Sequence, residues 1–220
     1  MTRAELAAAA ESRSRFYWWL AGWLLNVSAQ ADLQSLREMN GVTDQVAPEL
    51  ADALNGFIAA AQAVPDLERE TRLGAEYTRL FGGLSQDVAP PPPFESVWRE
   101  DRLVGEVTLA VLDAYQQAGF ADIDATPGPQ DHLAVELKFM SLLALREQEA
   151  WLAGNETSVD TRLIQQRDFL DQHALIWIPQ WAARIRKNSH EPFYRYLADL
   201  ISAYLAMDRQ HLQDLLTNET

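Results

Sequence analysis

Hydrophobic residues recur along this chain every three or four positions, the spacing of one face of an α-helix. Leu50, Leu54, Phe57 and Ile58 show the pattern clearly. No stretch alternates apolar and polar residues over the length of a β-strand. The pattern predicts an all-α protein, folded as one bundle-like domain of about eight or nine helices. These helices are expected at residues 2–26, 31–39, 48–64, 67–81, 97–118, 131–152, 159–187 and 192–216.

Proline and glycine residues interrupt the predicted helices. Pro179 lies inside the segment 159–187 and should kink or break it, because proline removes a backbone donor. Residues 122–130 contain prolines and a glycine and are predicted to be a hinge, which joins an N-terminal half of about residues 1–121 to a C-terminal half, 131–220. Because such a hinge can fold back or extend, we predict a mainly monomeric protein with a minor domain-swapped dimer.

One segment, residues 76–98, departs from the helical pattern. Its helix ends before two glycines, and four consecutive prolines follow at 90–93. This run stays extended, because each proline ring fixes φ near about −65°. Phe94 and Trp98 come next, and large aromatic side chains beside a stiff segment either lie on a surface or form one. We therefore expect the rest of the chain to hold this segment against a second one, residues 127–136.

The formal net charge of −14 and the lack of cysteine exclude several kinds of partner and of chemistry. The negative charge argues against nucleic acid and anionic membranes as partners and favours basic ones. Without cysteine, the chain can form no disulfide, thiol nucleophile or cysteine-ligated metal site. No stretch reaches the ~18 apolar residues of a membrane span. Residues 13–29 resemble a short secretory signal, but crowded aromatics and preceding acidic residues favour a retained helix and a cytoplasmic protein.

Asp131, His132 and Glu136 form the best candidate for a reactive cluster. His132 and Glu136 are four residues apart in a predicted helix, which would place both on one face, able to share a metal ion or a proton. The alternative function based on this cluster is a helical, metal-dependent enzyme. However, one helix supplies only two ligands, and the cluster lacks a nucleophile and a third group. We therefore predict no catalytic residue, no metal site and no cofactor.

Two further interpretations use the same features differently. The proline run could be a ligand for a proline-reading domain. That role requires exposure, whereas the neighbouring Phe81, Phe94 and Trp98 favour burial. A helical scaffold, or a module linked to transcription, is disfavoured by the negative charge and by the lack of a basic recognition helix.

The chain resembles the TorD/DmsD family of redox-enzyme maturation chaperones in three stretches. The first marker of that family is similar to E-Y-T-R-L-F-G followed by P-P-F-E-S-V-W. Its second marker, a proline-containing hinge before Asp-His at a helix start, is similar to P-G-P-Q-D-H-L-A-V-E-L. Its last helix is similar to H-E-P-F-Y-R-Y-L-A-D-L. One departure is Gly83-Leu84, where many relatives have Gly-Pro.

The resemblance implies an all-helical, cytoplasmic chaperone with a TorD/DmsD-like fold. Such a protein binds the twin-arginine signal peptide and the apo form of a molybdopterin-containing oxidoreductase, and delays its export until the cofactor is inserted. That leader is basic and then apolar, so an acidic protein with an aromatic- and proline-lined groove complements both parts. Arginines pair bidentately with carboxylates such as Glu76 or Asp131. The predicted leader-binding residues are Glu76, Tyr77, Leu80, Phe81, Pro92, Pro93, Phe94, Ser96, Trp98, Asp131, His132 and Glu136.

Overall fold

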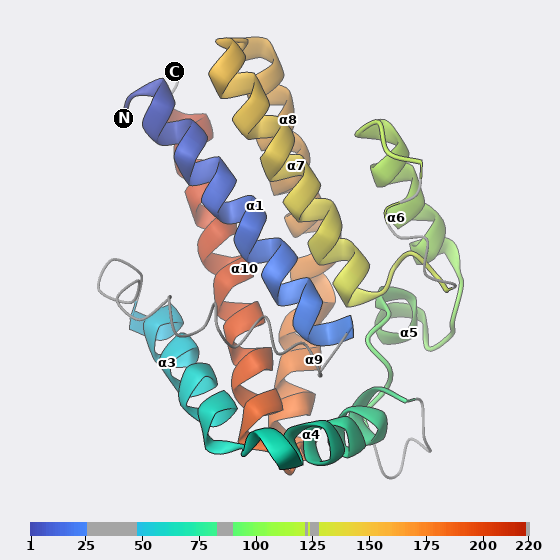
Figure 1. Ribbon diagram of the computed structural model, residues 1–220. Helices are drawn as coiled ribbons and strands as arrows, with labels where there is room; N and C mark the ends of the chain where they lie inside the picture. The colour runs from blue at the N-terminus through green and yellow to red at the C-terminus, as the bar shows by residue number, and fades with distance from the viewer. Residues whose placement is uncertain (26–47, 83–89, 122, 124–127, 219–220) are drawn as a thin grey trace. The chain divides into compact units, whose positions relative to one another are not determined.

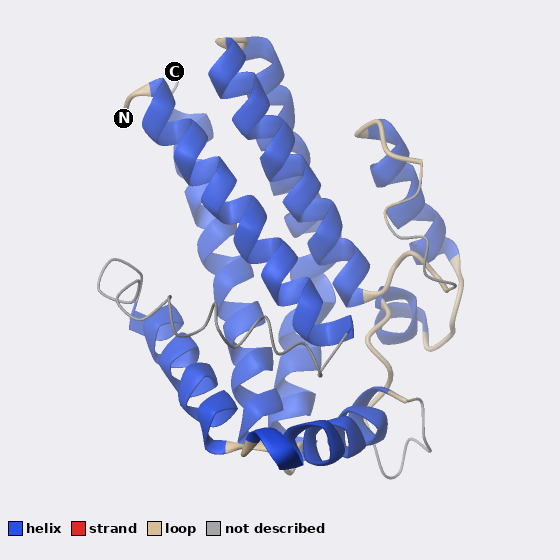
Figure 2. Ribbon diagram, viewed as in Figure 1, coloured by secondary structure: helices blue, strands red, loops and turns tan. Residues whose placement is uncertain are grey.

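The computed structural model describes residues 1–25, 48–82, 90–121, 123 and 128–218. Within these residues the named elements are all helical, apart from one isolated β-bridge, which confirms the predicted all-α class (Figures 1 and 2). None of the described helices is long and apolar enough to cross a membrane. The elements are α1 (Arg3–Leu25), α3 (Pro48–Ala63), α4 (Asp66–Phe81), α5 (Glu95–Glu100), α6 (Glu106–Gln117), α7 (Leu133–Ala153), α8 (Glu156–Phe169), the π-helical turn η2 (Leu170–Ala174), α9 (Leu175–Asn188) and α10 (Pro192–Asn218).

The chain forms two compact units, each built from segments that are separated in sequence. Unit 1 consists of Met1–Leu25, Phe94–Ile176 and Asp208–Thr220, and unit 2 of Asn26–Pro93 and Trp177–Met207. Helices α9 and α10 therefore contribute residues to both units. The expectation of one domain with a hinge at 122–130 stays a prediction. Most of that hinge, and the whole helix expected at 31–39, lie outside the described residues.

Unit 1 is organised around the packing of α1 along α7. The apolar side of α1, which includes Trp23, is buried, and so is Arg13 on the same helix. The Arg13 guanidinium donates to Asp208 Oδ1 at 2.5 Å, to Glu147 Oε2 at 2.6 Å and to Gln166 Oε1 at 2.6 Å. A buried charge is stable only with such partners. The network therefore fixes α1, α7, α8 and the C-terminal part of α10 in register.

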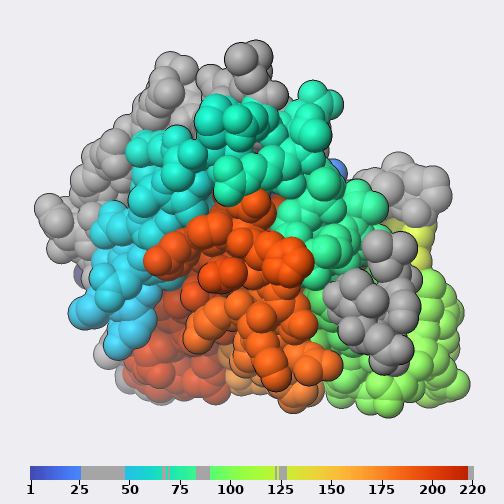
Figure 3. All heavy atoms as spheres, turned by 90° about the horizontal axis from the view of Figure 1, so that it is seen from below, coloured from blue at the N-terminus to red at the C-terminus, as the bar shows by residue number. Residues whose placement is uncertain are grey.

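Unit 2 packs α3 and α4 against parts of α9 and α10. Figure 3 shows α3 and α4 flanking the orange surface of α9 and α10. Phe57 of α3 contacts Phe193 of α10 with ring centroids 5.0 Å apart. The Tyr194 hydroxyl donates to the Leu73 carbonyl of α4 at 2.8 Å. Aromatic side chains thus join three helices of this unit.

The prediction of one helix over residues 97–118 is wrong. The structure has two helices there, α5 and α6, with a connection at 101–105. Asp101 and Val104 in this connection have φ values of 54° and 63°. These left-handed conformations cannot continue a right-handed helix, and they are uncommon for a β-branched residue such as valine. The apolar spacing runs across the break, which is why periodicity alone missed it.

The helix predicted over residues 159–187 is divided, but not at its proline. Helix α8 ends at Phe169, the wider turn η2 follows, and Pro179 lies inside α9. Proline has no N–H to donate to the carbonyl four residues earlier, which is that of Leu175. The widened turn ends directly before Leu175, so the irregularity lies one turn before the proline.

Candidate functional site

The two marker segments meet within unit 1. Phe94 and His132 form the isolated antiparallel β-bridge, and their rings contact edge to face with centroids 4.9 Å apart. The Glu95 N–H donates to the Asp131 carbonyl at 2.9 Å, and the Ser96 N–H donates to Asp131 Oδ2 at 2.9 Å. We call these four contacts the marker junction. They confirm that the ends of the two segments are held together.

Asp131 is the buried centre of this junction, with no exposed surface. Its carboxylate accepts a hydrogen bond from the first turn of α5, where backbone N–H groups lack helical partners. Oδ2 makes this bond, whereas Oδ1 receives no hydrogen bond from the described part of the chain. The buried Ser96 hydroxyl is likewise without a hydrogen-bond partner among these residues. Asp131 therefore fixes the start of α5 through Oδ2, and its Oδ1 can accept a further hydrogen bond.

His132 precedes α7 instead of lying on it, contrary to expectation. It is the N-cap residue, with an extended backbone, and its Nδ1 accepts from the Ala134 N–H at 3.1 Å. Because the cap lies outside the helix, His132 and Glu136 do not share a helical face as predicted. Glu136 is buried, whereas His132 is partly exposed. The carboxylate of the preceding residue, Asp131, bonds to α5 and not to α7.

A buried ionic group beside the junction was missed by the sequence analysis. Glu95, which has no exposed surface, forms an ion pair with Arg99 and lies 3.1 Å from His173 Nδ1 through Oε2. The spacing of Glu95 and Arg99, four residues apart in F-E-S-V-W-R, is a sequence signal for this pair. No local signal indicates His173, which lies 78 residues from Glu95. This group anchors α5 to η2.

The pKa of the buried Tyr115 phenol depends on the carboxylates near the marker junction. Its hydroxyl donates to the Gln130 carbonyl at 3.0 Å. Burial raises the pKa of Tyr115 well above its ordinary value, and the charges of Glu136, Glu95 and Asp131 add to the effect. Three buried carboxylates are therefore close enough to act on one phenol.

In unit 2 the first marker contributes a further buried carboxylate, Glu76. Its Oε1 accepts from Arg79 at 2.7 Å, from the Ser189 hydroxyl at 3.0 Å and from the His190 N–H at 2.6 Å, while Oε2 accepts from Arg79 at 2.7 Å. Burial alone would raise the pKa of Glu76, but the bonds from Arg79, His190 and Ser189 outweigh it and hold the pKa below its ordinary value. Both oxygens are engaged within the unit. The link to residues 189 and 190 was not anticipated.

Aromatic residues of the first marker form a cluster on α4. Tyr77 and Phe81 are half-buried and contact edge to face, with centroids 5.0 Å apart. Phe81 also stacks on Trp181 at 6.4 Å and meets Tyr194 at 5.8 Å. Leu80, which lies on the same helix, is fully buried. Tyr77 and Phe81 thus keep part of their surface exposed to solvent, whereas Leu80 does not.

The remaining predicted residues differ in exposure. Pro92, Phe94 and Trp98 are partly exposed, whereas Pro93 and Ser96 are buried.

Among the described residues, no three histidine, aspartate or glutamate side chains are grouped so that they could hold a metal ion. The partly exposed aromatic and proline side chains are thus the ones accessible to a partner.

Several known proteins are similar to this chain in sequence. Residues 30–183 match the family described as nitrate reductase delta subunit. The chaperone protein TorD of Vibrio cholerae El Tor Inaba N16961 is 26% identical over 228 residues, which cover 98% of each chain. TorD of Vibrio parahaemolyticus is 24% identical and covers 94% of this chain and 98% of its own.

A solved structure supports the fold independently. A crystal structure described as a redox enzyme maturation protein from Archaeoglobus fulgidus superposes with a TM-score of 0.51 at 20% identity. The match covers 88% of this chain and 93% of the other. The TorD relatives are named as chaperones, which confirms the interpretation that the chain is not an enzyme and does not favour the metal-dependent alternative. The chain belongs to the nitrate reductase delta subunit family, which includes TorD-type maturation chaperones, as its marker segments indicated.

Proposed function

We propose that this protein is a cytoplasmic chaperone that binds the twin-arginine signal peptide and the apo form of a molybdopterin-containing oxidoreductase. By covering the leader, it delays export until the cofactor has been inserted. The observation that carries the proposal is the marker junction, in which Asp131 holds the start of α5 while Phe94 and His132 pair at the surface. The similarity to TorD chaperones supports the same role.

The junction offers an apolar, preorganised contact for the leader. The Phe94 and His132 rings are partly exposed and already fixed by their mutual contact and by backbone hydrogen bonds. A ligand that binds a fixed surface avoids the entropic cost of ordering it. Trp98, also partly exposed, adds a further accessible side chain of unit 1. The apolar part of a leader suits these surfaces.

Charge supplies the complement to the basic part of the leader. The protein carries a net charge of −14, and the carboxylate of Asp131 lies in the marker junction. Long-range attraction of this kind accelerates association with a basic peptide and weakens as salt rises. Tyr77 and Phe81 of unit 2 are proposed as further leader contacts.

The test is calorimetric titration of the full-length protein with a synthetic peptide that carries two adjacent arginines before an apolar segment. We expect micromolar or tighter binding, about −8 kcal/mol or better. Phe94→Ala should weaken it several-fold, whereas Tyr196→Ala, which truncates an exposed aromatic on α10, should not. Equal affinity for a scrambled peptide of the same composition would disprove the proposal.

A further inference from the structure

Three large apolar side chains at the start of α6 are exposed to solvent. Leu103, Val104 and Leu109 keep 53%, 57% and 57% of their surface exposed. The first two lie in the connection between α5 and α6, and Leu109 lies one turn into α6. We call these three residues the α6 patch. Exposed apolar side chains that are grouped on a surface mark sites of interaction, whereas single ones need no explanation.

The start of α6 brings these side chains near one another. Gly105 is the N-cap residue, so Val104 and Leu109 occupy the two positions that flank the first turn, whose apolar side chains commonly pack together. More than half of each side chain nevertheless stays exposed. Leu103 directly precedes Val104 in the chain. The three residues are therefore neighbours and not scattered single exposures.

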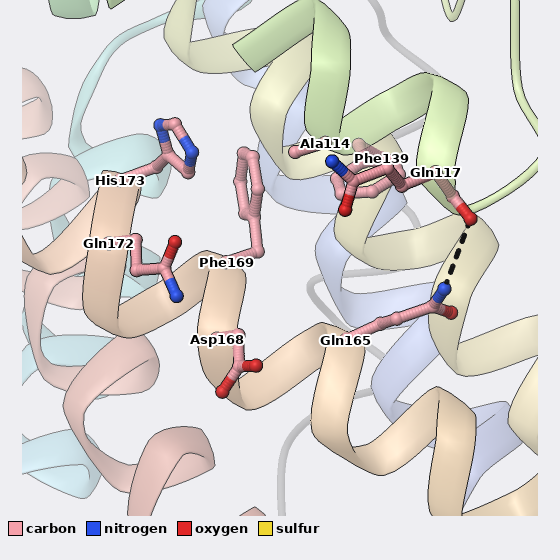
Figure 4. Close-up of a pocket in the computed structure, with 8 residues that line it drawn as sticks. All are labelled: Ala114, Gln117, Phe139, Gln165, Asp168, Phe169, Gln172 and His173. Atoms are coloured by element: carbon pink, nitrogen blue, oxygen red, sulfur yellow. Dashed lines mark hydrogen bonds between the residues drawn. The ribbon is translucent and has the colours of Figure 1, made fainter. Parts of the chain in front are cut away.

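The opposite side of α6 packs on the core of unit 1. Val107 and Val111 of this helix are buried. Figure 4 shows the same side further along α6, where Ala114 and Phe139 of α7 line one pocket. Residues two positions apart on a helix lie on nearly opposite sides, and Leu109 is two positions from both valines. Leu109 therefore lies on the side of α6 that faces away from this core.

The connection that carries the α6 patch has a strained backbone. Val104 has a φ of 63°, in the left-handed region that β-branched residues rarely adopt. Glu100 holds the connection in place, because its Oε1 accepts from the Val107 N–H at 3.3 Å and its Oε2 from Arg102 Nε at 3.2 Å. A Cβ at Gly105 would lie 1.8 Å from Glu100 Oε2, so this close approach requires glycine. Strained backbone of this kind is concentrated at active and binding sites, where it fixes a surface in advance.

Exposed carboxylates flank the α6 patch. Glu106 and Asp113 lie three positions before and four positions after Leu109, on the same side of α6. Asp101 is also exposed. Arg102, the one basic residue of this connection and helix, already pairs with a carboxylate. An apolar surface with carboxylates around it complements a peptide in which basic side chains stand next to apolar ones.

We propose that the α6 patch is a second contact surface for the leader of the client, which covers it with the apolar side chains that follow the two arginines. The inference rests on the proposed function and extends the leader path from the marker junction along α5. Helix α5 has six residues and is about 9 Å long, so one peptide can reach both surfaces. In this arrangement the arginines lie beside the exposed carboxylates of Asp101, Glu106 and Asp113, which belong to the same unit.

The experiment is calorimetric titration of the full-length protein and its variants with a synthetic leader peptide. Leu109→Ser and Leu103→Ser each remove one apolar side chain of the patch, and Leu103 is not one of the two residues that flank the first turn of α6. The matched control is Leu152→Ser, which changes an exposed leucine of α7 outside the patch. A second peptide carries two glutamines in place of the arginines. Circular dichroism checks that helicity is unchanged.

We expect Leu109→Ser and Leu103→Ser each to weaken leader binding about three- to tenfold, because less apolar surface is buried in the complex. Leu152→Ser should change the affinity less than about twofold. Glu106→Gln should weaken binding of the arginine peptide about threefold at low salt and leave the glutamine peptide unaffected. Glu49→Gln, an exposed change in the first turn of α3, should alter neither affinity.

Equal leader affinities of the three serine variants would overturn the role of the patch while the wild-type protein still binds the leader. Light scattering adds a second check. A wild-type dimer that is lost in Leu109→Ser would show that the patch joins two copies of the chain, and would overturn the leader contact. Failure of the wild-type protein to bind the arginine peptide at all would instead overturn the proposed function, and the assignment of the patch with it.

Discussion

Among the buried carboxylates of the two marker segments, Glu76 in unit 2 and Asp131 in unit 1 have different surroundings. Glu76 in unit 2 accepts from Arg79, Ser189 and His190, so both its oxygens are occupied. Asp131 in unit 1 accepts from Ser96 through Oδ2, and its Oδ1 has no hydrogen bond from the described residues. A fully satisfied carboxylate stabilises the fold, whereas one with spare capacity can respond to a ligand.

The comparison shows that buried carboxylates of the two marker segments need not share a role. Glu76 ties α4 to the turn between α9 and α10, which makes it a structural element of unit 2. Asp131 organises the start of α5, where partly exposed aromatic residues lie. We therefore expect substitutions of Glu76 to act mainly on stability and substitutions near Asp131 mainly on binding.

The largest expected effect is that of Glu76→Ala on stability. Removing this carboxylate leaves the Ser189 hydroxyl, the His190 N–H and Arg79 without their shared acceptor. The free energy of unfolding should fall by about 2–4 kcal/mol, measured by urea denaturation followed by circular dichroism. Glu70→Ala, an exposed substitution on the same helix, should change it by less than about 0.5 kcal/mol. Equal effects of both substitutions would show that the hydrogen bonds of Glu76 do not stabilise the fold.

The second prediction concerns the acid side of the stability curve. The folded-state pKa of Glu76 lies below its ordinary value of 4.5, because its hydrogen bonds outweigh the cost of burial. The unfolded state therefore binds the proton more tightly. The stabilisation from Glu76 is full above pH 4.5 and is lost as the pH falls through the folded-state pKa. The difference in free energy of unfolding between wild type and Glu76→Gln should shrink below pH 4.5, and a difference independent of pH would contradict the assignment.

The third prediction separates the two roles of His132. His132→Ala removes both the ring and the acceptor for the Ala134 N–H, and should lower the free energy of unfolding by about 1 kcal/mol. His132→Asn keeps an N-cap acceptor and should restore most of this loss. Both variants lack the ring that contacts Phe94, so both should bind the leader peptide several-fold more weakly in calorimetry. Recovery of affinity in His132→Asn would show that only the cap matters.

The smallest expected change in stability is that of Asp131→Asn. The amide oxygen can still accept from the Ser96 N–H, so the free energy of unfolding should fall by less than about 1 kcal/mol. Loss of the charge should weaken leader binding about threefold at low salt, with a smaller difference at high salt. A destabilisation as large as that of Glu76→Ala would remove the contrast between the two carboxylates.

Much of the fold follows from local sequence. The spacing of apolar residues predicted helices close to the observed α1, α3, α4, α7 and α10, and Pro48 begins α3 as expected. The break at Asp101 and Val104 was not predicted, because no glycine marks it at these positions and valine rarely adopts a left-handed conformation. The π-helical turn η2 was missed for a similar reason, since nothing in L-D-Q-H-A distinguishes it from an α-helix.

By itself, the sequence determined the helical class, the negative charge and the two marker segments, because each depends on composition or on residues a few positions apart. It also indicated that the segments meet. Only the tertiary structure decided which buried charges pair, such as Arg13 with Asp208, 195 residues apart, or Glu95 with His173. Long-range pairs of this kind leave no periodic trace in the sequence. Their partners are selected by the packing of helices, which brings distant side chains together and removes them from water.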